Sequence, residues 1–376
     1  MTTPEEILAL LEEHTNVLLY GPPGTGKSYL MKQVENLFKA RHDGSSSGEK
    51  FFIDTGAERE AINSVPTPAS HSRWVTFHQG YSYEDFIVGL RPVPSHGDGT
   101  SGSVLSLEAK AGALLELAAY ARESRGLMLI DEINRGNASR IFGEFITLME
   151  ADKRLGEDGT LLETTVTVTL PYLAHGQNMK VDDGVEIERE FQMPHNVYTL
   201  ASMNSVDKSV APIDAAIRRR FYVCQLKPSD SDWESVAGVA GAKNSVAEIA
   251  VKVMKKVNRG IGLYLGPGYM LGQYYLPAKP KLGQLDEEDA KRRFVSIWRH
   301  KVIPQLLEFF HSRPSVCMSI LELNDLGNDS GLAAVNPTDE EANEGASAFV
   351  LNEAAEKSDD AIYTYLVDFA ATSVST

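Results

Sequence analysis

The sequence predicts an α/β fold in which helices cover a parallel five-stranded sheet and a smaller helical domain follows. Three observations support this prediction. A short apolar stretch, a glycine-rich loop and a helical pattern follow one another within 17–40. The continuous apolar run Leu127–Ile130 is typical of a strand in a parallel sheet that is covered on both faces. Strand and helix patterns alternate up to residue 226, and mostly helical patterns follow.

The expected elements can be placed along the chain in order. Thr3, Pro4 and Glu6 form a helix start, with a capping hydroxyl, a proline in the first turn and an acid three residues after the cap. Strands are expected at 17–20, 74–77, 127–130, 197–201 and 221–226. Helices are expected at 29–40, 107–123, 138–150, 287–311 and 360–370, and loops at 41–50 and 92–104. We therefore expect an α/β nucleotide-binding core at 1–227 with a β-hairpin insertion at 155–195, a helical lid at 228–325 and a C-terminal extension at 326–376.

Composition and charge exclude several function classes. The chain has 376 residues, 43% of them hydrophobic, which fits one large or two smaller globular domains. A net charge of −16 argues against nonspecific wrapping of nucleic acid by the bulk surface, while a local basic groove stays open. The two cysteines, Cys224 and Cys317, form neither a disulfide framework nor a zinc site, which favours a reducing cytoplasm. We expect no signal peptide and no membrane partner, because no leader pattern or long apolar run is present.

The most specific motif matches G-x-x-x-x-G-K-[ST] at every position. Its residues, with the tyrosine that follows, are Gly21, Pro22, Pro23, Gly24, Thr25, Gly26, Lys27, Ser28 and Tyr29. A strand before the loop and a helix after it are the context of a phosphate-binding loop, since glycines let backbone amides approach an anion and the helix N-terminus adds partial positive charge. Lys27 is expected to reach the β- and γ-phosphates, and the hydroxyl of Ser28 to bind Mg²⁺.

Two carboxylates end the apolar run at 127–130. Asp131 is expected to bind Mg²⁺ and Glu132 to polarise the attacking water, because phosphoryl transfer requires one carboxylate on the metal and another near the nucleophile. The alternative is a solvated Asp-Glu pair at a strand end. We expect no metal other than Mg²⁺, because the histidines are scattered.

Asn204 follows the expected strand at 197–201 and is a candidate to orient the same water or contact the γ-phosphate. The alternative is an ordinary turn asparagine. The catalytic reading requires its strand to lie between the strand that feeds the glycine loop and the strand that ends at Asp131, where ligands bind in open α/β sheets.

Three consecutive arginines precede the last expected strand. Arg218 and Arg219 are candidates for a finger that reaches a neighbouring subunit's γ-phosphate, and Arg220 continues the run. Arg135 is a further candidate. Structural ion pairs or solvated surface arginines are the alternatives.

Taken together, the motifs resemble those of AAA+ ATPases, and more narrowly of the McrB family, the GTP-driven motor subunits of modification-dependent restriction systems. The resemblance rests on the glycine loop and on four further segments. These are Thr-Phe-His-Gln-Gly-Tyr-Ser-Tyr-Glu-Asp-Phe at 76–86, Ile-Asp-Glu-Ile-Asn-Arg-Gly-Asn at 130–137, Met-Asn-Ser-Val-Asp-Lys-Ser at 203–209 and Arg-Arg-Arg-Phe at 218–221. Gly-Tyr-Met-Leu-Gly at 268–272 extends it towards the C-terminus.

The resemblance implies a hexameric ring with nucleotide at the subunit interfaces, Asn204 and Asp207 near that nucleotide, and a separate nuclease partner of the McrC type. GTP is also implied only by the resemblance, because the loop reads phosphates and not the purine, so GTP and ATP both stay open. Lys208 stands where the family often has arginine, and lysine does not replace arginine at a bidentate contact. Only a short segment precedes the first expected strand, so we expect another subunit to read DNA.

Two other functions are compatible with the motifs. A MoxR-like AAA+ chaperone would remodel a protein partner, and DNA-stimulated turnover would distinguish it from a restriction motor. A nucleotide-gated scaffold would assemble without hydrolysis, but it would not need Lys27, Asp131, Glu132 and Asn204 all intact.

Overall fold

The computed structural model describes residues 2–42, 70–94, 105–182, 185–206, 213–323, 332–334, 349–351 and 358–372. The chain divides into two compact units. The first, here called the α/β unit, comprises Thr2–Tyr20 and Lys27–Gln225. The second, the helical unit, comprises Leu226–Thr376 together with Gly21–Gly26, which is most of the glycine loop.

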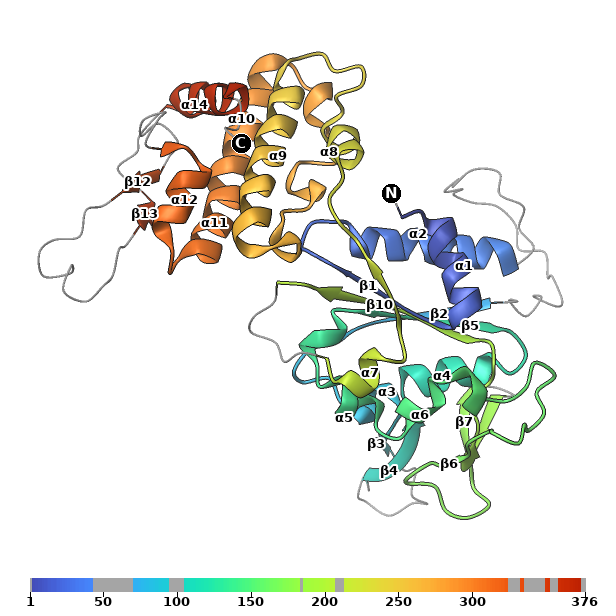
Figure 1. Ribbon diagram of the computed structural model, residues 1–376. Coiled ribbons are helices and arrows are strands. Elements are labelled where there is room, and N and C mark those ends of the chain that lie inside the picture. Colours follow the sequence, from blue (N-terminus) through green and yellow to red (C-terminus); the bar gives the residue numbers. More distant parts are fainter. Residues whose placement is uncertain are drawn as a thin grey trace, which may run out of the picture. The chain divides into compact units, whose positions relative to one another are not determined.

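A five-stranded sheet forms the centre of the α/β unit, in the order β11-β1-β10-β5-β2 (Figure 1). Its strands are β1 (Asn16–Gly21), β2 (Ser70–Thr76), β5 (Arg125–Asp131), β10 (Val197–Asn204) and β11 (Tyr222–Gln225). The pairs β1–β11, β5–β10 and β2–β5 are parallel. The predicted α/β fold class and parallel sheet are therefore confirmed, and β10 lies between β1 and β5 as the catalytic reading of Asn204 requires.

Helices cover both faces of this sheet. Figure 1 shows α1 and α2 on one face and α3 to α7 on the other. The helices are α1 (Pro4–His14), α2 (Lys27–His42), α3 (Tyr83–Phe86), α4 (Ala113–Tyr120), α5 (Ala138–Phe142), α6 (Phe145–Leu148) and α7 (Ala215–Arg218). The predicted start of α1 is confirmed, because Thr3 and Glu6 form a reciprocal capping box. Single 3₁₀ turns occur at Ile133–Arg135 and Ala151–Lys153.

Two stretches differ from their sequence prediction. The start of the expected loop at 92–104 and of the expected helix at 107–123 belongs to an antiparallel pair, β3 (Val88–Pro94) and β4 (Leu105–Ala111). Residues 95–104 of that loop lie outside the described residues. Residues 105–111 alternate apolar and polar side chains, which is the period of a strand, so the helix begins only at Ala113. The expected helix at 138–150 is broken at Gly143, whose φ of 51° interrupts the helical backbone.

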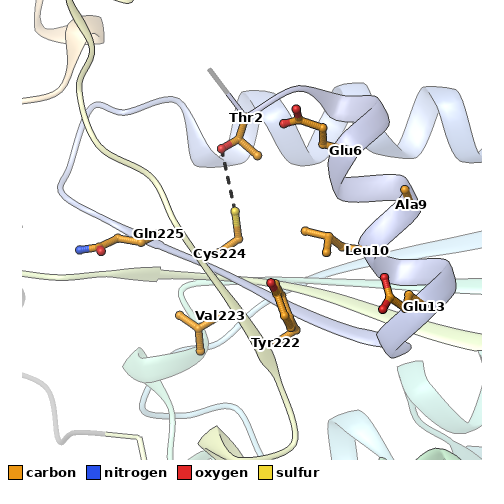
Figure 2. A pocket seen from close by; sticks show the side chains of 9 residues that line it. All are labelled: Thr2, Glu6, Ala9, Leu10, Glu13, Tyr222, Val223, Cys224 and Gln225. Atoms are coloured by element: carbon orange, nitrogen blue, oxygen red, sulfur yellow. Dashed lines mark hydrogen bonds between the residues drawn. The ribbon is translucent and has the colours of Figure 1, made fainter.

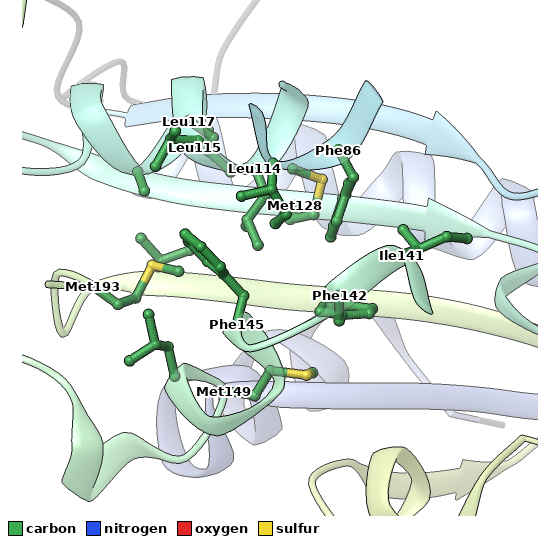
Figure 3. Close-up of a cluster of buried hydrophobic side chains, with 14 of the residues drawn as sticks. Phe86, Leu114, Leu115, Leu117, Met128, Ile141, Phe142, Phe145, Met149 and Met193 are labelled. Carbon is green, nitrogen blue, oxygen red and sulfur yellow. The ribbon is translucent and has the colours of Figure 1, made fainter. Parts of the chain in front are cut away.

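The segment 155–195 carries two short antiparallel pairs. They are β7 (Asn178–Asp182) with β8 (Val185–Glu188) and β6 (Val168–Thr169) with β9 (Glu190–Phe191). Its buried side chains join the main core, and Figure 3 shows Met193 of this segment beside Phe145 of α6. Phe145 also stacks on Phe191 with ring centroids 5.6 Å apart. Packing of this kind fixes the segment on the α/β unit, because buried aromatic side chains contribute the largest apolar areas.

The helical unit is built around the long helix α9 (Val246–Leu265). The other helices are α8 (Asp230–Ala237), α10 (Glu287–Ile297), α11 (Ile303–Phe310), α12 (Pro314–Ile320) and α14 (Asp359–Ala371), with a π-helical turn at Trp298–Val302 and 3₁₀ turns at Pro267–Tyr269, Gln273–Tyr275 and Leu282–Gln284. A short strand pair joins β12 (Leu332–Ala334) to β13 (Phe349–Leu351).

Lys256 of α9 donates a hydrogen bond to the carbonyl of Phe369 at 3.0 Å, near the C-terminal end of α14, where a cation is favourable. Within the part of the chain that the structure describes, no helix has the length and apolarity needed to cross a bilayer.

A buried carboxylate ties α2 to β2 in the α/β unit. The Glu35 side chain is 4% exposed. It accepts hydrogen bonds from Lys32 (2.6 Å), Lys39 (2.8 Å), Ser72 (2.6 Å) and Trp74 (2.9 Å). Burial by itself would raise the pKa of Glu35, but these hydrogen bonds outweigh burial and lower the pKa from 4.5 to about 2.

We expect Glu35→Gln to lower the free energy of unfolding at pH 7 by about 3 kcal/mol, the value of the pKa shift. Because the folded-state pKa is the lower one, this stabilisation is complete above pH 4.5 and is lost as the pH falls towards 2. Urea unfolding of both proteins at several pH values measures it. A difference between them that does not shrink between pH 5 and pH 2.5 would contradict this role of the charge.

Candidate functional site

The glycine loop adopts a backbone that only its glycines accept easily. Gly24 and Gly26 have φ values of 77° and 85°, in the region that side chains disfavour. The hydroxyl of Thr25 donates to the carbonyl of Pro22 at 2.9 Å and closes the loop on itself. The chain then passes directly into α2 at Lys27, so the loop ends at a helix N-terminus.

A network of polar side chains lies at the carboxyl ends of β5 and β10 and the start of α2. We call it the polar cluster, and its members are Lys27, Ser28, Asp131, Glu132, Ser202 and Asn204. Lys27 Nζ donates to Asn204 Oδ1 at 2.6 Å, and Asn204 Nδ2 donates to Glu132 Oε1. The asparagine amide therefore connects the expected phosphate-binding lysine to the expected catalytic carboxylate.

The second branch of the polar cluster contains the expected metal ligands. Ser28 Oγ lies 3.1 and 3.3 Å from the two carboxylate oxygens of Asp131. Ser202 Oγ donates to Asp131 Oδ1 and accepts the backbone N–H of Glu132 at 3.1 Å. Ser202 was missed by the sequence reasoning. Its signal is its place two residues before Asn204, because residues i and i+2 of a strand face the same side.

Glu132 has a strained backbone. Its φ of 55° and ψ of 47° place it in the left-handed region, which costs a non-glycine residue ~1–3 kcal/mol. The 3₁₀ turn Ile133–Arg135 follows, and Arg135 Nε lies 3.5 Å from Glu132 Oε2. Strain of this kind persists only where the surroundings fix the residue, here through the N–H bond to Ser202 and the side-chain bond from Asn204.

Comparisons with known proteins identify relatives of this chain. A sequence-family profile described as an AAA domain of the dynein-related subfamily matches residues 69–221. The EcoKMcrB subunit of the type IV methyl-directed restriction enzyme of Escherichia coli K12 is 32% identical over 321 residues, covering 83% of this chain and 58% of its own length. The chain belongs to the McrB-like AAA+ family.

A second relative of this McrB-like chain is component YdiS of the type II restriction enzyme BsuMI of Bacillus subtilis 168. It is 27% identical over 227 residues, covering 55% of each protein. The chain thus spans rather more than half the length of these two relatives. The solved structure of C. elegans PCH-2 aligns over 84% of this chain and 64% of its own with 15% identity and a TM-score of 0.31.

Lys27 is held in a buried, anionic setting in this AAA+ core. The side chain is buried, and this burial lowers the pKa of the Lys27 ammonium to about 8, although the carboxylates of Glu132 and Asp131 act to raise it. An anionic phosphate beside the ammonium would favour its charged form further. The environment therefore suits a lysine whose charge is compensated by a ligand.

The donors around Asp131 fit a magnesium ion. Among the described residues, no group of three or more His, Cys, Asp or Glu side chains is arranged to hold a metal. Ser28 and Asp131 instead offer one hydroxyl and one carboxylate side by side. This is the set that Mg²⁺ uses when phosphates and waters supply its remaining ligands.

The three arginines have different environments in the McrB-like fold. Arg220 is nearly buried, pairs with Glu150 at 2.7 Å and donates to the carbonyl of Ala216 at 2.6 Å. Arg218 and Arg219 are exposed on α7 and at its C-cap. The run therefore divides into one structural arginine and two solvent-facing ones.

Tyr29 and Asp207 are the other residues expected to bind nucleotide. Tyr29 lies in the first turn of α2 with 59% of its surface exposed. Asp207 lies outside the described residues.

A separate groove of about 520 Å³ lies between α1 and the edge strand β11 (Figure 2). Its lining residues are Thr2, Glu6, Ala9, Leu10, Glu13, Tyr222, Val223, Cys224 and Gln225. None of them belongs to the polar cluster or the glycine loop, so this groove is not the expected nucleotide site.

Proposed function

We propose that this chain is a nucleoside triphosphatase that drives a restriction complex, hydrolysing GTP or ATP with Mg²⁺. The observation that carries the proposal is the polar cluster, in which Lys27, Asn204 and Glu132 form one hydrogen-bonded chain at the ends of adjacent parallel strands. Ligands bind at this edge in open α/β sheets.

Each residue of the polar cluster has a role in the proposed reaction. The loop amides and Lys27 would hold the β- and γ-phosphates, and Ser28 with Asp131 would hold Mg²⁺. When bound, the ion would neutralise charge on the phosphate oxygens. Glu132 would polarise the attacking water, and Asn204, already bonded to Glu132, would orient it.

We infer the biological setting from the relatives. One is a subunit of a type IV methyl-directed restriction enzyme and the other a component of a type II restriction enzyme. We propose that this chain likewise works in a multi-subunit restriction complex in the cytoplasm, as a hexameric ring with a separate McrC-like nuclease that acts on invading DNA. Asp207 and the exposed arginines would then face the nucleotide of a neighbouring subunit.

Purification of the full chain with and without the products of neighbouring genes tests this proposal. Hydrolysis of GTP and of ATP is measured with Mg²⁺, with EDTA, and with and without DNA. We expect Mg²⁺-dependent turnover of one nucleotide that rises with the partner and DNA. Turnover that responds to a protein substrate and never to DNA or a nuclease would support the chaperone function instead.

We expect Arg219→Ala to leave nucleotide binding unchanged but to slow hydrolysis in the assembled ring by on the order of 1,000-fold, because a finger arginine stabilises transition-state charge. Arg220→Ala is the matched control. It removes the pair with Glu150, so it should lower the melting temperature instead. Mixed rings of Arg219→Ala and wild-type subunits that hydrolyse at the wild-type rate would rule out a finger at Arg219.

A further inference from the structure

A turn in the helical unit binds the backbone carbonyls of the glycine loop. We call Gly272–Tyr275 the GQYY turn. The N–H of Gly272 donates to the carbonyl of Pro23 at 3.0 Å, and the N–H of Tyr274 donates to the carbonyl of Gly24 at 2.8 Å. Between them, Gln273 Nε2 donates to the carbonyl of Thr25 at 3.0 Å. Consecutive carbonyls of the loop are therefore all bound by one short segment.

These bonds fix the direction of the loop amides. A trans peptide is planar, so its N–H points opposite to its C=O. Because the carbonyls of residues 23–25 face the GQYY turn, the N–H groups of Gly24, Thr25 and Gly26 point away from it. Successive N–H groups turned to one side form an anion-binding nest, which is what a phosphate-binding loop presents to its ligand.

Contact between the two segments is close enough to exclude side chains. A Cβ atom on Gly272 would lie 2.0 Å from the carbonyl carbon of Gly24. A Cβ on Gly24 would meet the ring of Tyr275 at 2.9 Å, and one on Gly26 would meet the ring of Tyr274 at 2.5 Å. Gly272 is thus required by this packing, and Gly24 and Gly26 are favoured both by the packing and by their positive φ angles.

The GQYY turn is itself held by helices of the same unit. Asn258 of α9 forms two hydrogen bonds with the backbone of Leu271, at 2.8 and 2.6 Å. The hydroxyl of Tyr275 donates to Gln305 of α11 at 2.9 Å. The position of the loop carbonyls therefore depends on α9 and α11.

The side chain of Gln273 is buried against the glycine loop and hydrogen-bonded to it. It is 6% exposed, and its Oε1 is buried without a hydrogen-bond donor among the described residues. Burying an amide with an unsatisfied oxygen costs free energy, on the order of 1–3 kcal/mol. The hydrogen bond from Nε2 to the carbonyl of Thr25 offsets part of this cost.

We propose that the GQYY turn is a positioning element of the nucleotide site, with Gln273 as a positioning residue. It holds the loop in its phosphate-binding conformation and couples nucleotide affinity to the packing of the helical unit. This inference rests on the proposed nucleotide binding, and it adds residues that lie outside the phosphate loop and the polar cluster.

Gln273→Leu and Gly272→Ala in the full chain test this role, with a fluorescent GTP or ATP analogue and Mg²⁺ as the probe. Loss of the amide bond should weaken binding about tenfold, and the Gly272→Ala clash by at least about 100-fold. At saturating nucleotide the turnover number of Gln273→Leu should stay within about threefold of wild type, because the loop acts on binding. Gln284→Leu, at an exposed glutamine of the same unit, is the matched control and should bind normally.

Hydrogen exchange of the wild-type chain gives a readout that does not depend on any variant. Nucleotide binding should slow exchange at the amides of Gly272 and Tyr274, since both donate to the loop. Unchanged exchange there, or normal affinity in folded Gln273→Leu and Gly272→Ala, would overturn the inference. A wild-type chain that binds no nucleotide would instead refute the proposed function.

Discussion

Lys27→Ala is expected to abolish nucleotide binding. The ammonium is the cationic group of the polar cluster, and charge-assisted hydrogen bonds to phosphate contribute ~1.5–3 kcal/mol each. Loss of two such bonds weakens binding by more than about 100-fold. Titration of a fluorescent nucleotide in the presence of Mg²⁺ measures the effect.

Lys180→Ala is the matched control for this variant, because Lys180 is exposed on β7. It should bind nucleotide as the wild type does. The Lys27 variant should also keep its fold, since an alanine there leaves Asn204 bonded to Glu132. Wild-type affinity in folded Lys27→Ala would remove the basis of the proposed function.

Glu132→Gln is expected to leave nucleotide binding intact and to lower turnover by ~10²–10⁴-fold, the range for loss of a general base. The amide oxygen of glutamine can still accept the bond from Asn204, so the geometry of the polar cluster should persist without the carboxylate. The variant should therefore accumulate as a nucleotide-bound ring. Single-turnover kinetics and light scattering measure the two effects.

Glu123→Gln, at an exposed position before β5, is the control and should hydrolyse normally. Hydrolysis by Glu132→Gln at the wild-type rate would show that the water is activated by another group. A fall in affinity equal to the fall in turnover would indicate that Glu132 supports binding instead.

Much of the α/β unit could be predicted because its signals are local. An apolar strand, a glycine loop and a helix follow one another along the chain, and the same is true of the apolar run that ends at Asp131. The parallel sheet then follows, since strands that alternate with helices pair in this way. The wrong prediction at β4 also has a local cause, because the alternating residues 105–111 run directly into a leucine- and alanine-rich helix.

Other features required contacts between distant parts of the chain. Three adjacent arginines look alike in sequence, and the burial of Arg220, its pair with Glu150 and its bond to Ala216 separate it from its neighbours. The role of Ser202 depends on the pairing of β10 with β5. This pairing brings its hydroxyl within hydrogen-bonding distance of Asp131 and of the backbone N–H of Glu132. Such assignments depend on partners dozens of residues away, which periodicity does not record.

The sequence by itself determined the α/β class, the sheet strands, the glycine loop and the identity of the residues expected to handle phosphate and metal. Only the tertiary structure decided that Asn204 joins Lys27 to Glu132, and that Gly272, Gln273 and Tyr274 bind the loop carbonyls. The physical reason is the sequence separation of the residues that interact. Strand, turn and helix preferences arise from neighbouring residues, whereas a hydrogen bond between residues 25 and 273 exists only after the chain has folded.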